Sequence, residues 1–174
     1  MAPKFLLIFV TVLLSGCVME ERHKYDVQIK EVTPHELSEV FPLFVQLNPS
    51  AKEATFMKNY NKAKKNEYNL YKAVITETGK LHTVGLMGYL FNEDLCVGRT
   101  MYIDILVVDK HYRNKGIGKQ LMKFAISKLH QDKCARFLRW TTRNNLAEAI
   151  SFYKNAIASP IGYYYRIDNP NFNE

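Results

Sequence analysis

The stretch that decides the fold spans residues 102–119 and reads YIDILVVDKHYRNKGIGK. Its first part, Tyr102 to Val108, is almost continuously apolar, which is typical of a strand buried on both faces and therefore central in a sheet. Its last part opens an amphipathic helix, because apolar residues recur with helical spacing from Gly116 to His130. We therefore expect a buried strand that leads, through a glycine-containing turn, into a helix packed on the sheet.

The sequence on both sides predicts a mixed sheet covered by helices. Upstream we expect a strand, two helices and a hairpin, at Val27 to Val32, Pro34 to Leu47, Ala51 to Lys65, and Tyr68 to Thr76 with Thr83 to Phe91. Downstream we expect a strand, a helix and a strand, at Ala135 to Thr142, Asn145 to Ile157 and Gly162 to Ile167. This order predicts an α/β fold in which a right-handed crossover joins two parallel strands.

The composition predicts one globular domain with a basic surface. The 174 residues carry 24 Lys and Arg against 17 Asp and Glu, a net charge of +7, and 47% of them are hydrophobic. We expect a signal-like segment at residues 1–18, a folded domain at 25–168 and a tail at 169–174. The positive charge attracts polyanions, which include phosphate-bearing cofactors as well as nucleic acids.

The three cysteines predict neither a disulfide framework nor a metal site, because they form no C-x-x-C and have no His at zinc-ligand spacing. Cys17 ends the run Leu14-Ser15-Gly16-Cys17, which follows an apolar stretch too short to span a bilayer. This run resembles the lipobox of bacterial lipoproteins and implies membrane anchoring through Cys17. The alternative is a true start at Met19 and a cytoplasmic protein. Both stay open, and the intact mass of the native protein decides between them.

The turn at residues 113–119 has the features of a phosphate-binding site. The first turn of a helix carries unpaired amides and the positive end of the dipole, and Gly116 and Gly118 let an anion approach closely. Basic side chains surround the turn, from Arg113, Lys115 and Lys119. Two common phosphate loops are excluded: Walker A requires Ser or Thr where Gln120 stands, and G-x-G-x-x-G requires Gly or Ala where Leu121 stands.

In this position, residues 102–119 resemble the acetyl-CoA-binding signature of the GNAT superfamily of N-acetyltransferases. The similarity extends from Val27 to Ile167, because the element order is also that of the family, and Trp140-Thr141-Thr142 followed by Phe152-Tyr153 resembles its second conserved block. The resemblance implies a mixed, mostly antiparallel central sheet flanked by helices. It also implies a parallel, splayed strand pair at the acetyl-CoA site.

The resemblance implies cofactor contacts residue by residue. The CoA pyrophosphate is expected on the backbone amides of the turn formed by Arg113, Asn114, Lys115, Gly116, Ile117, Gly118 and Lys119. Main-chain groups of Leu106 and Val108 are expected along the pantetheine arm. Where relatives carry a further cofactor-binding Asn, this chain has Leu146, and the adjacent Asn145 either replaces that contact or only caps a helix.

Two catalytic roles follow from the same resemblance. Tyr153 matches the tyrosine that donates a proton to the departing thiolate, and its free phenol is protonated at neutral pH. Asp104 matches an acidic residue that relays the proton of the amine, and burying it without a purpose would be costly. The structural alternatives are a core tyrosine and a carboxylate that pairs with a basic side chain or faces solvent.

We therefore expect an N-acetyltransferase that moves an acetyl group from acetyl-CoA to a primary amine by direct attack, without a metal. The acceptor is either a small amine or polyamine or an amine of a protein. The alternative function is a non-catalytic module that binds CoA or a nucleotide, membrane-anchored if Cys17 is lipidated. No nucleic-acid partner is predicted, because the lysine-rich second helix is interpreted as solvated surface, and a homodimer stays open.

Overall fold

A computed structural model describes residues 25–96, 98–134, 136–139 and 151–152. The predicted segment at 1–18, most of the predicted last helix, the last strand and the tail lie outside these residues. Within the described part of the chain, no helix has the length and apolar character that crossing a membrane requires.

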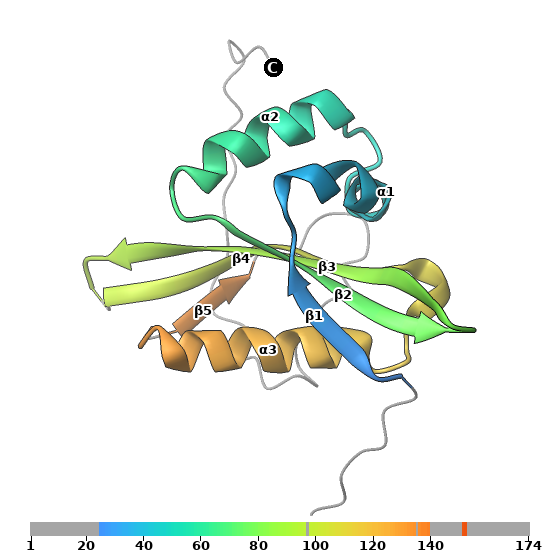
Figure 1. The fold of residues 1–174 in the computed structure, drawn as a ribbon. Coiled ribbons are helices and arrows are strands. Elements are labelled where there is room, and N and C mark those ends of the chain that lie inside the picture. Colours follow the sequence, from blue (N-terminus) through green and yellow to red (C-terminus); the bar gives the residue numbers. More distant parts are fainter. Residues whose placement is uncertain (1–24, 97, 135, 140–150, 153–174) are drawn as a thin grey trace, which may run out of the picture.

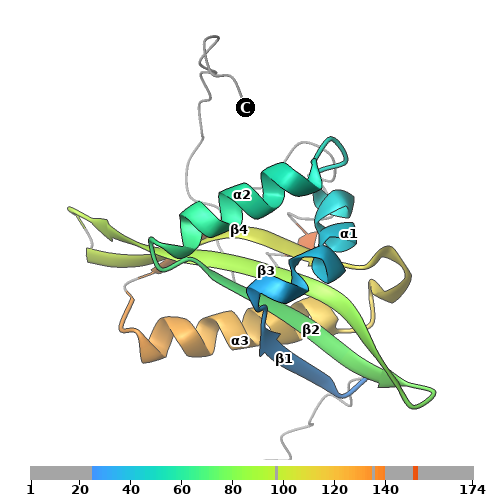
Figure 2. The ribbon, with the colours of Figure 1, turned by 45° about the horizontal axis from the view of Figure 1, so that its top comes forward.

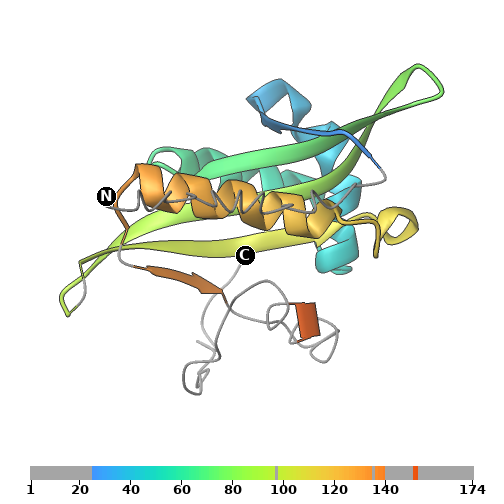
Figure 3. The same cartoon turned by 90° about the horizontal axis from the view of Figure 1, so that it is seen from below.

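The described chain forms three layers, with a five-stranded sheet in the middle (Figure 1). The strands follow each other in the order β1 (Val27–Glu31), β2 (Asn69–Glu77), β3 (Lys80–Asp94), β4 (Gly98–Val108) and β5 (Arg136–Arg139). The first four are antiparallel, and β5 runs parallel to β4. Figure 3 shows β5 beside β4 at one edge of the sheet. The predicted α/β class, the antiparallel sheet and the parallel crossover are confirmed.

Helices cover both faces of the sheet. Helices α1 (Leu37–Leu47) and α2 (Glu53–Lys64) lie on one face, and α3 (Ile117–Gln131) lies on the other (Figure 2). Each face has its own apolar core. Ile117, Leu121 and Met122 of α3 pack with Met101 and Ile103 of β4 in one core. The other core contains Val40, Phe56 and Tyr60 of α1 and α2, which we call the upper helices, together with Ile105 and Val107 of β4.

Strand β4 contributes to both cores, and a β-bulge at Asp104 changes which of its residues face each one. The register pairs Gly88 with Ile105 and Tyr89 with Ile103, so the strand pairing skips Asp104. The odd-numbered residues before the bulge, Met101 and Ile103, therefore face α3, and those after it, Ile105 and Val107, face α1 and α2. The expectation that this strand is buried on both faces is confirmed, although Tyr102, Asp104, Leu106 and Val108 are only half-buried.

Local sequence explains several element boundaries. Thr33 caps the first helical turn, and its amide donates a hydrogen bond of 2.8 Å to the Glu36 carboxylate. Thr78 and Gly79 have φ angles of 51° and 75°, which is the geometry of a two-residue hairpin turn between β2 and β3. Strands β3 and β4 extend further than predicted and form a ribbon whose polar outer part continues the backbone ladder.

A buried cation ties the sheet to the upper helical layer. Lys72 of β2 is 7% exposed, and its ammonium lies 2.9 Å from carboxylate oxygens of both Glu36 and Glu39. Thr83 of β3 donates a further hydrogen bond of 2.6 Å to Glu39. These partners satisfy a charge that would otherwise be costly to bury, so this group is structural.

Candidate active site

The turn before α3 has the backbone geometry of an anion-binding site. Asn114 and Gly116 have φ angles of 58° and 83°, and Gly116 is the N-cap of α3. At the start of α3, the Gln120 amide donates a hydrogen bond of 3.1 Å to the Gly116 carbonyl. Among the described residues, the amides of Gly116, Ile117 and Gly118 donate no backbone hydrogen bond outside the helix. The positive end of the 15-residue helix dipole lies at the same place.

The basic side chains of the turn have different environments. Arg113 is exposed, and its Nε donates a hydrogen bond of 3.2 Å to the carbonyl of Val108. The ammonium of Lys115 donates to the carbonyl of His111 at 2.7 Å and lies 4.8 Å from the ring centroid of Tyr112. Lys119 lies half-buried in the first turn of α3. Lys115 is therefore folded against its own loop, whereas Arg113 lies at the end of β4.

The loop that leads into the turn is anchored at Tyr112. Its hydroxyl donates a hydrogen bond of 2.7 Å to the Glu77 carboxylate at the end of β2. This bond raises the pKa of Tyr112 to about 12 and lowers the pKa of Glu77. Tyr112 therefore stays protonated at neutral pH, and its hydrogen bond holds the loop against the end of β2.

The side chain of Phe152 lies close to the turn, beside Gly118. A Cβ added at Gly118 would lie 3.1 Å from the ring of Phe152 and 3.7 Å from a methyl group of Val108. Glycine at this position thus lets the ring pack against the helix start. Phe152 precedes Tyr153, but Tyr153 and Asn145 both lie outside the described residues.

The carboxyl-terminal half of β4 runs toward the turn. The described parallel pairing with β5 covers Thr100 to Ile103 and ends at Arg139 of β5. Leu106 and Val108 lie beyond this pairing, half-buried, with side chains against the α3 core. The Val108 carbonyl already accepts the Arg113 hydrogen bond, but a carbonyl oxygen has two lone pairs and can accept another.

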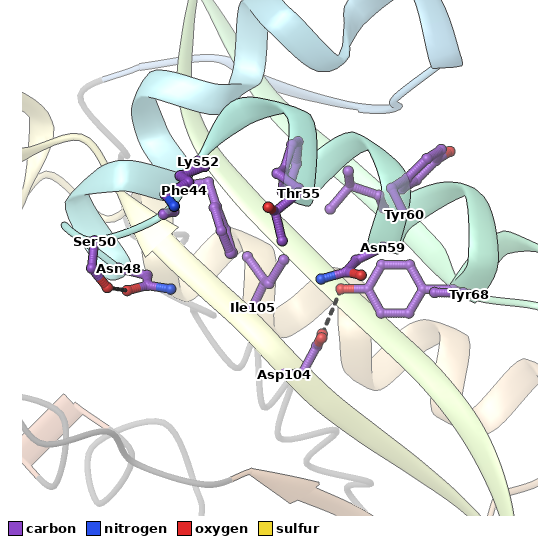
Figure 4. A pocket seen from close by; sticks show the side chains of 14 residues that line it. Phe44, Asn48, Ser50, Lys52, Thr55, Asn59, Tyr60, Tyr68, Asp104 and Ile105 are labelled. Carbon is purple, nitrogen blue, oxygen red and sulfur yellow. Dashed lines mark hydrogen bonds between the residues drawn. The ribbon is translucent and has the colours of Figure 1, made fainter. Parts of the chain in front are cut away.

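A pocket of about 430 Å³ lies between the upper helices and β4 (Figure 4). It is lined by the end of α1, the start and inner face of α2, Tyr68, and the bulge of β4. Asp104 and Ile105 both line it, although consecutive residues of a regular strand point to opposite faces. The bulge therefore places the Asp104 carboxylate in the pocket.

Tyr68 and Gly88 hold this carboxylate in place. The Tyr68 hydroxyl donates a hydrogen bond of 2.6 Å to Asp104 Oδ1. A Cβ at Gly88 would collide with the Tyr68 hydroxyl and lie 3.1 Å from Asp104 Oδ1. The pair therefore requires glycine at position 88. Figure 4 shows the Asn59 side chain beside this pair.

Sequence reasoning missed the pocket and most of its residues. Tyr68, Asn59 and Thr55 come from segments far from Asp104 in the chain, and no spacing relates them. One signal was present, because an isolated glycine inside a strand, here Gly88, is typical of a bulge or of a close approach by another group.

Comparison with known proteins identifies the family. Residues 37–156 match the model of the acetyltransferase (GNAT) family. The chain belongs to the GNAT family. The predicted membership is thus confirmed, and the family is one of acetyltransferases that use acetyl-CoA. No curated protein matches the chain.

Solved structures share the GNAT fold. A ribosomal-protein-alanine N-acetyltransferase from Brucella melitensis is 18% identical, with a TM-score of 0.68 over 83% of this chain and 99% of that chain. A glucosamine-6-phosphate N-acetyltransferase from Arabidopsis thaliana is 18% identical, with a TM-score of 0.63 over 82% and 98%. An aminoglycoside N-acetyltransferase in complex with CoA is 14% identical, with a TM-score of 0.68 over 84% and 96%. At these identities the likeness shows the fold alone.

In the part of the GNAT domain that the structure describes, no three His, Cys, Asp or Glu side chains gather in a way that could hold a metal ion. Cys96 is exposed and Cys134 is buried, and both are free thiols. The described site is thus made of backbone amides, one carboxylate and a tyrosine.

Proposed function

We propose that this protein transfers an acetyl group from acetyl-CoA to a primary amine. The observation that carries the proposal is the geometry at Gly116 to Gly118, where amides without backbone partners among the described residues and a helix dipole meet after β4. The backbone at these residues fits the diphosphate of CoA. The turn of Arg113 to Lys119 would hold that diphosphate, and the main chain at Leu106 and Val108 would bind the pantetheine arm.

The amine would attack from the pocket that contains Asp104. Its nitrogen forms a bond to the thioester carbonyl carbon, the carbon–sulfur bond breaks, and the electron pair leaves with the sulfur. Asp104 accepts a proton from the amine, and Tyr68 keeps the carboxylate oriented through their hydrogen bond of 2.6 Å. Tyr153 donates a proton to the departing thiolate. The products are an amide and the free thiol of CoA.

The pocket favours a compact acceptor with a single cationic nitrogen. Its volume of about 430 Å³ is at the small end of the range for ligand sites. Among the described residues that line it, Asp104 is the one carboxylate, and Lys52 at the start of α2 disfavours a second cation. The other polar side chains of the pocket are neutral, from Asn48, Ser50, Thr55, Asn59, Tyr60 and Tyr68.

Calorimetry and a free-thiol assay test this function together. Acetyl-CoA should bind, and thiol release should be measured with butylamine, 4-aminobutanoate and 1,4-diaminobutane, which share a four-carbon chain and carry a neutral methyl, a carboxylate and an ammonium group at the far end. We expect the diamine to be the poorest of the three. Absence of acetyl-CoA binding would refute the enzyme, and binding without thiol release for any amine would favour a non-catalytic CoA-binding module.

A further inference from the structure

Gln46 in the last turn of α1 connects the upper helices to the loop that enters the phosphate-binding turn. Its Nε2 donates a hydrogen bond of 2.9 Å to Asp109 Oδ2, and its Oε1 accepts one of 2.9 Å from the Lys110 amide. Both ends of the side-chain amide are therefore used. The partners directly follow Val108, the last residue of β4.

Asp109 distributes this connection over the loop. Its other carboxylate oxygen accepts a hydrogen bond of 2.8 Å from the His111 amide, and its own amide donates to the Val84 carbonyl at 2.9 Å. Burial alone would raise the pKa of Asp109, but the hydrogen bonds from His111 and Gln46 lower it overall. Asp109, with hydrogen bonds to both carboxylate oxygens, thus fixes the path of the chain between β4 and η2 (Lys110–Tyr112).

The same helical turn also contacts the acceptor pocket. Phe44 and Asn48 line the pocket, and the Asn48 amide donates to the Phe44 carbonyl at 2.9 Å. Residues four apart share one face of a helix, and Gln46 lies between them on the opposite face. The last turn of α1 therefore presents one side to the acceptor and the other to the cofactor loop.

We propose that Gln46 is a positioning residue that sets the backbone path into residues 113–119 and thereby the affinity for acetyl-CoA. This inference rests on the proposed function, and it concerns a residue far from the turn in sequence. Gln46 itself contacts neither the acetyl group nor the amine in this scheme. It acts through Asp109 and Lys110.

Two substitutions and one exchange test the proposal. Gln46→Met keeps the size of the side chain and removes both hydrogen bonds, so the Kd of acetyl-CoA should rise about tenfold. Gln46→Glu places a second carboxylate beside Asp109 and should weaken binding further.

In the double variant Gln46→Glu with Asp109→Asn, donor and acceptor exchange places while the bonds to His111 and Lys110 are kept. Affinity should return to within about threefold of the natural protein.

The matched control is Gln28→Met, because Gln28 is exposed on β1, which pairs with β2 and not with β4. It should leave the Kd unchanged. The KM for acetyl-CoA should rise in Gln46→Met while the KM for the amine changes by less than twofold, a split that general loss of stability would not produce.

If the natural protein binds acetyl-CoA and Gln46→Met binds it equally well, the inference is wrong. If the natural protein does not bind acetyl-CoA, the proposed function itself fails. A double variant that melts normally but binds as weakly as Gln46→Glu also contradicts the inference.

Discussion

The turn before α3 and the pocket beneath α2 are built in opposite ways. The turn is a run of consecutive residues, 113–119, and its chemistry comes from the backbone and from two glycines. The pocket is assembled from α1, α2, Tyr68 and β4, and its chemistry comes from side chains such as Asp104. A contiguous backbone site tolerates changes of side chain but not of conformation, whereas the pocket should show the reverse. Substitutions can test this difference.

The largest effect is expected at the pocket, from Asp104→Asn. The new amide oxygen still accepts the Tyr68 hydrogen bond, so the geometry is kept while the proton acceptor is lost. Turnover should fall about 100-fold or more, with the Kd of acetyl-CoA unchanged. Steady-state kinetics and calorimetry measure the two quantities. Asp26→Asn, at an exposed position, is the control, and unchanged turnover in Asp104→Asn would remove this residue from the mechanism.

The next effect is expected at the turn, from Gly116→Val. A β-branched residue is strained at a φ of 83°, so the amides should shift and the Kd of acetyl-CoA should rise about tenfold or more. Gly79→Val is the matched control, because Gly79 has a φ of 75° and nothing within 4 Å of an added Cβ. Urea unfolding should show a similar loss of about 1–2 kcal/mol in both variants. Equal acetyl-CoA affinity in the two would show that the turn does not bind the cofactor.

A smaller effect is expected from the support of Asp104. Tyr68→Phe removes one hydrogen bond to a carboxylate and should lower turnover about fivefold, again without a change in acetyl-CoA affinity. Gly88→Ala should give the same phenotype by a different route, since the added methyl group displaces the Tyr68 hydroxyl. Combined, the two changes should cost less than the product of the separate losses, because both break the same contact. Simple multiplication of the losses would argue against a shared contact.

The smallest effect on either site is expected from Lys72→Met, which acts on stability. The backbone hydrogen bond from Thr33 and then Lys72 lower the pKa of Glu36 to about 2, and the pKa of Glu39 is also lowered. Carboxylates with lowered pKa values stabilise the fold above their usual pKa near 4.5, and this contribution is lost as the pH falls toward 2.

In Lys72→Met the loss of unfolding free energy between pH 5 and pH 2.5 should therefore shrink by about 1 kcal/mol. Part of the acid dependence should stay, because the Thr33 contact stays. Urea unfolding across this pH range measures the change, and Lys62→Met, at an exposed position of α2, is the control. An unaltered pH dependence would mean that Lys72 does not set these pKa values.

The sequence predicted the turn and the layers well because their signals are local. The glycines before α3, the spacing of its apolar residues and the Thr78-Gly79 hairpin each act within a few residues. Family resemblance then supplied the expectation about the cofactor. The extra length of β3 and β4 was missed because their outer residues are polar and held mainly by backbone pairing.

The pocket was predicted only at Asp104, because its other parts depend on contacts between distant segments. The continuous apolar run around Asp104 suggested burial on both faces, but a bulge changes which face each residue meets. Hydrogen bonds such as Tyr68 to Asp104 and Gln46 to Asp109 join residues 36 and 63 positions apart. Periodicity carries no information about such pairs.

The bulge in β4 also makes the number of residues in this strand matter as much as their types. Deleting Ile105, Leu106 or Val107 would exchange the inward- and outward-facing side chains of β4 on one side of the deletion. A one-residue deletion here should thus be more harmful than nearly any replacement. The number of residues between Asp104 and the turn at residues 113–119 therefore sets the distance between the two sites.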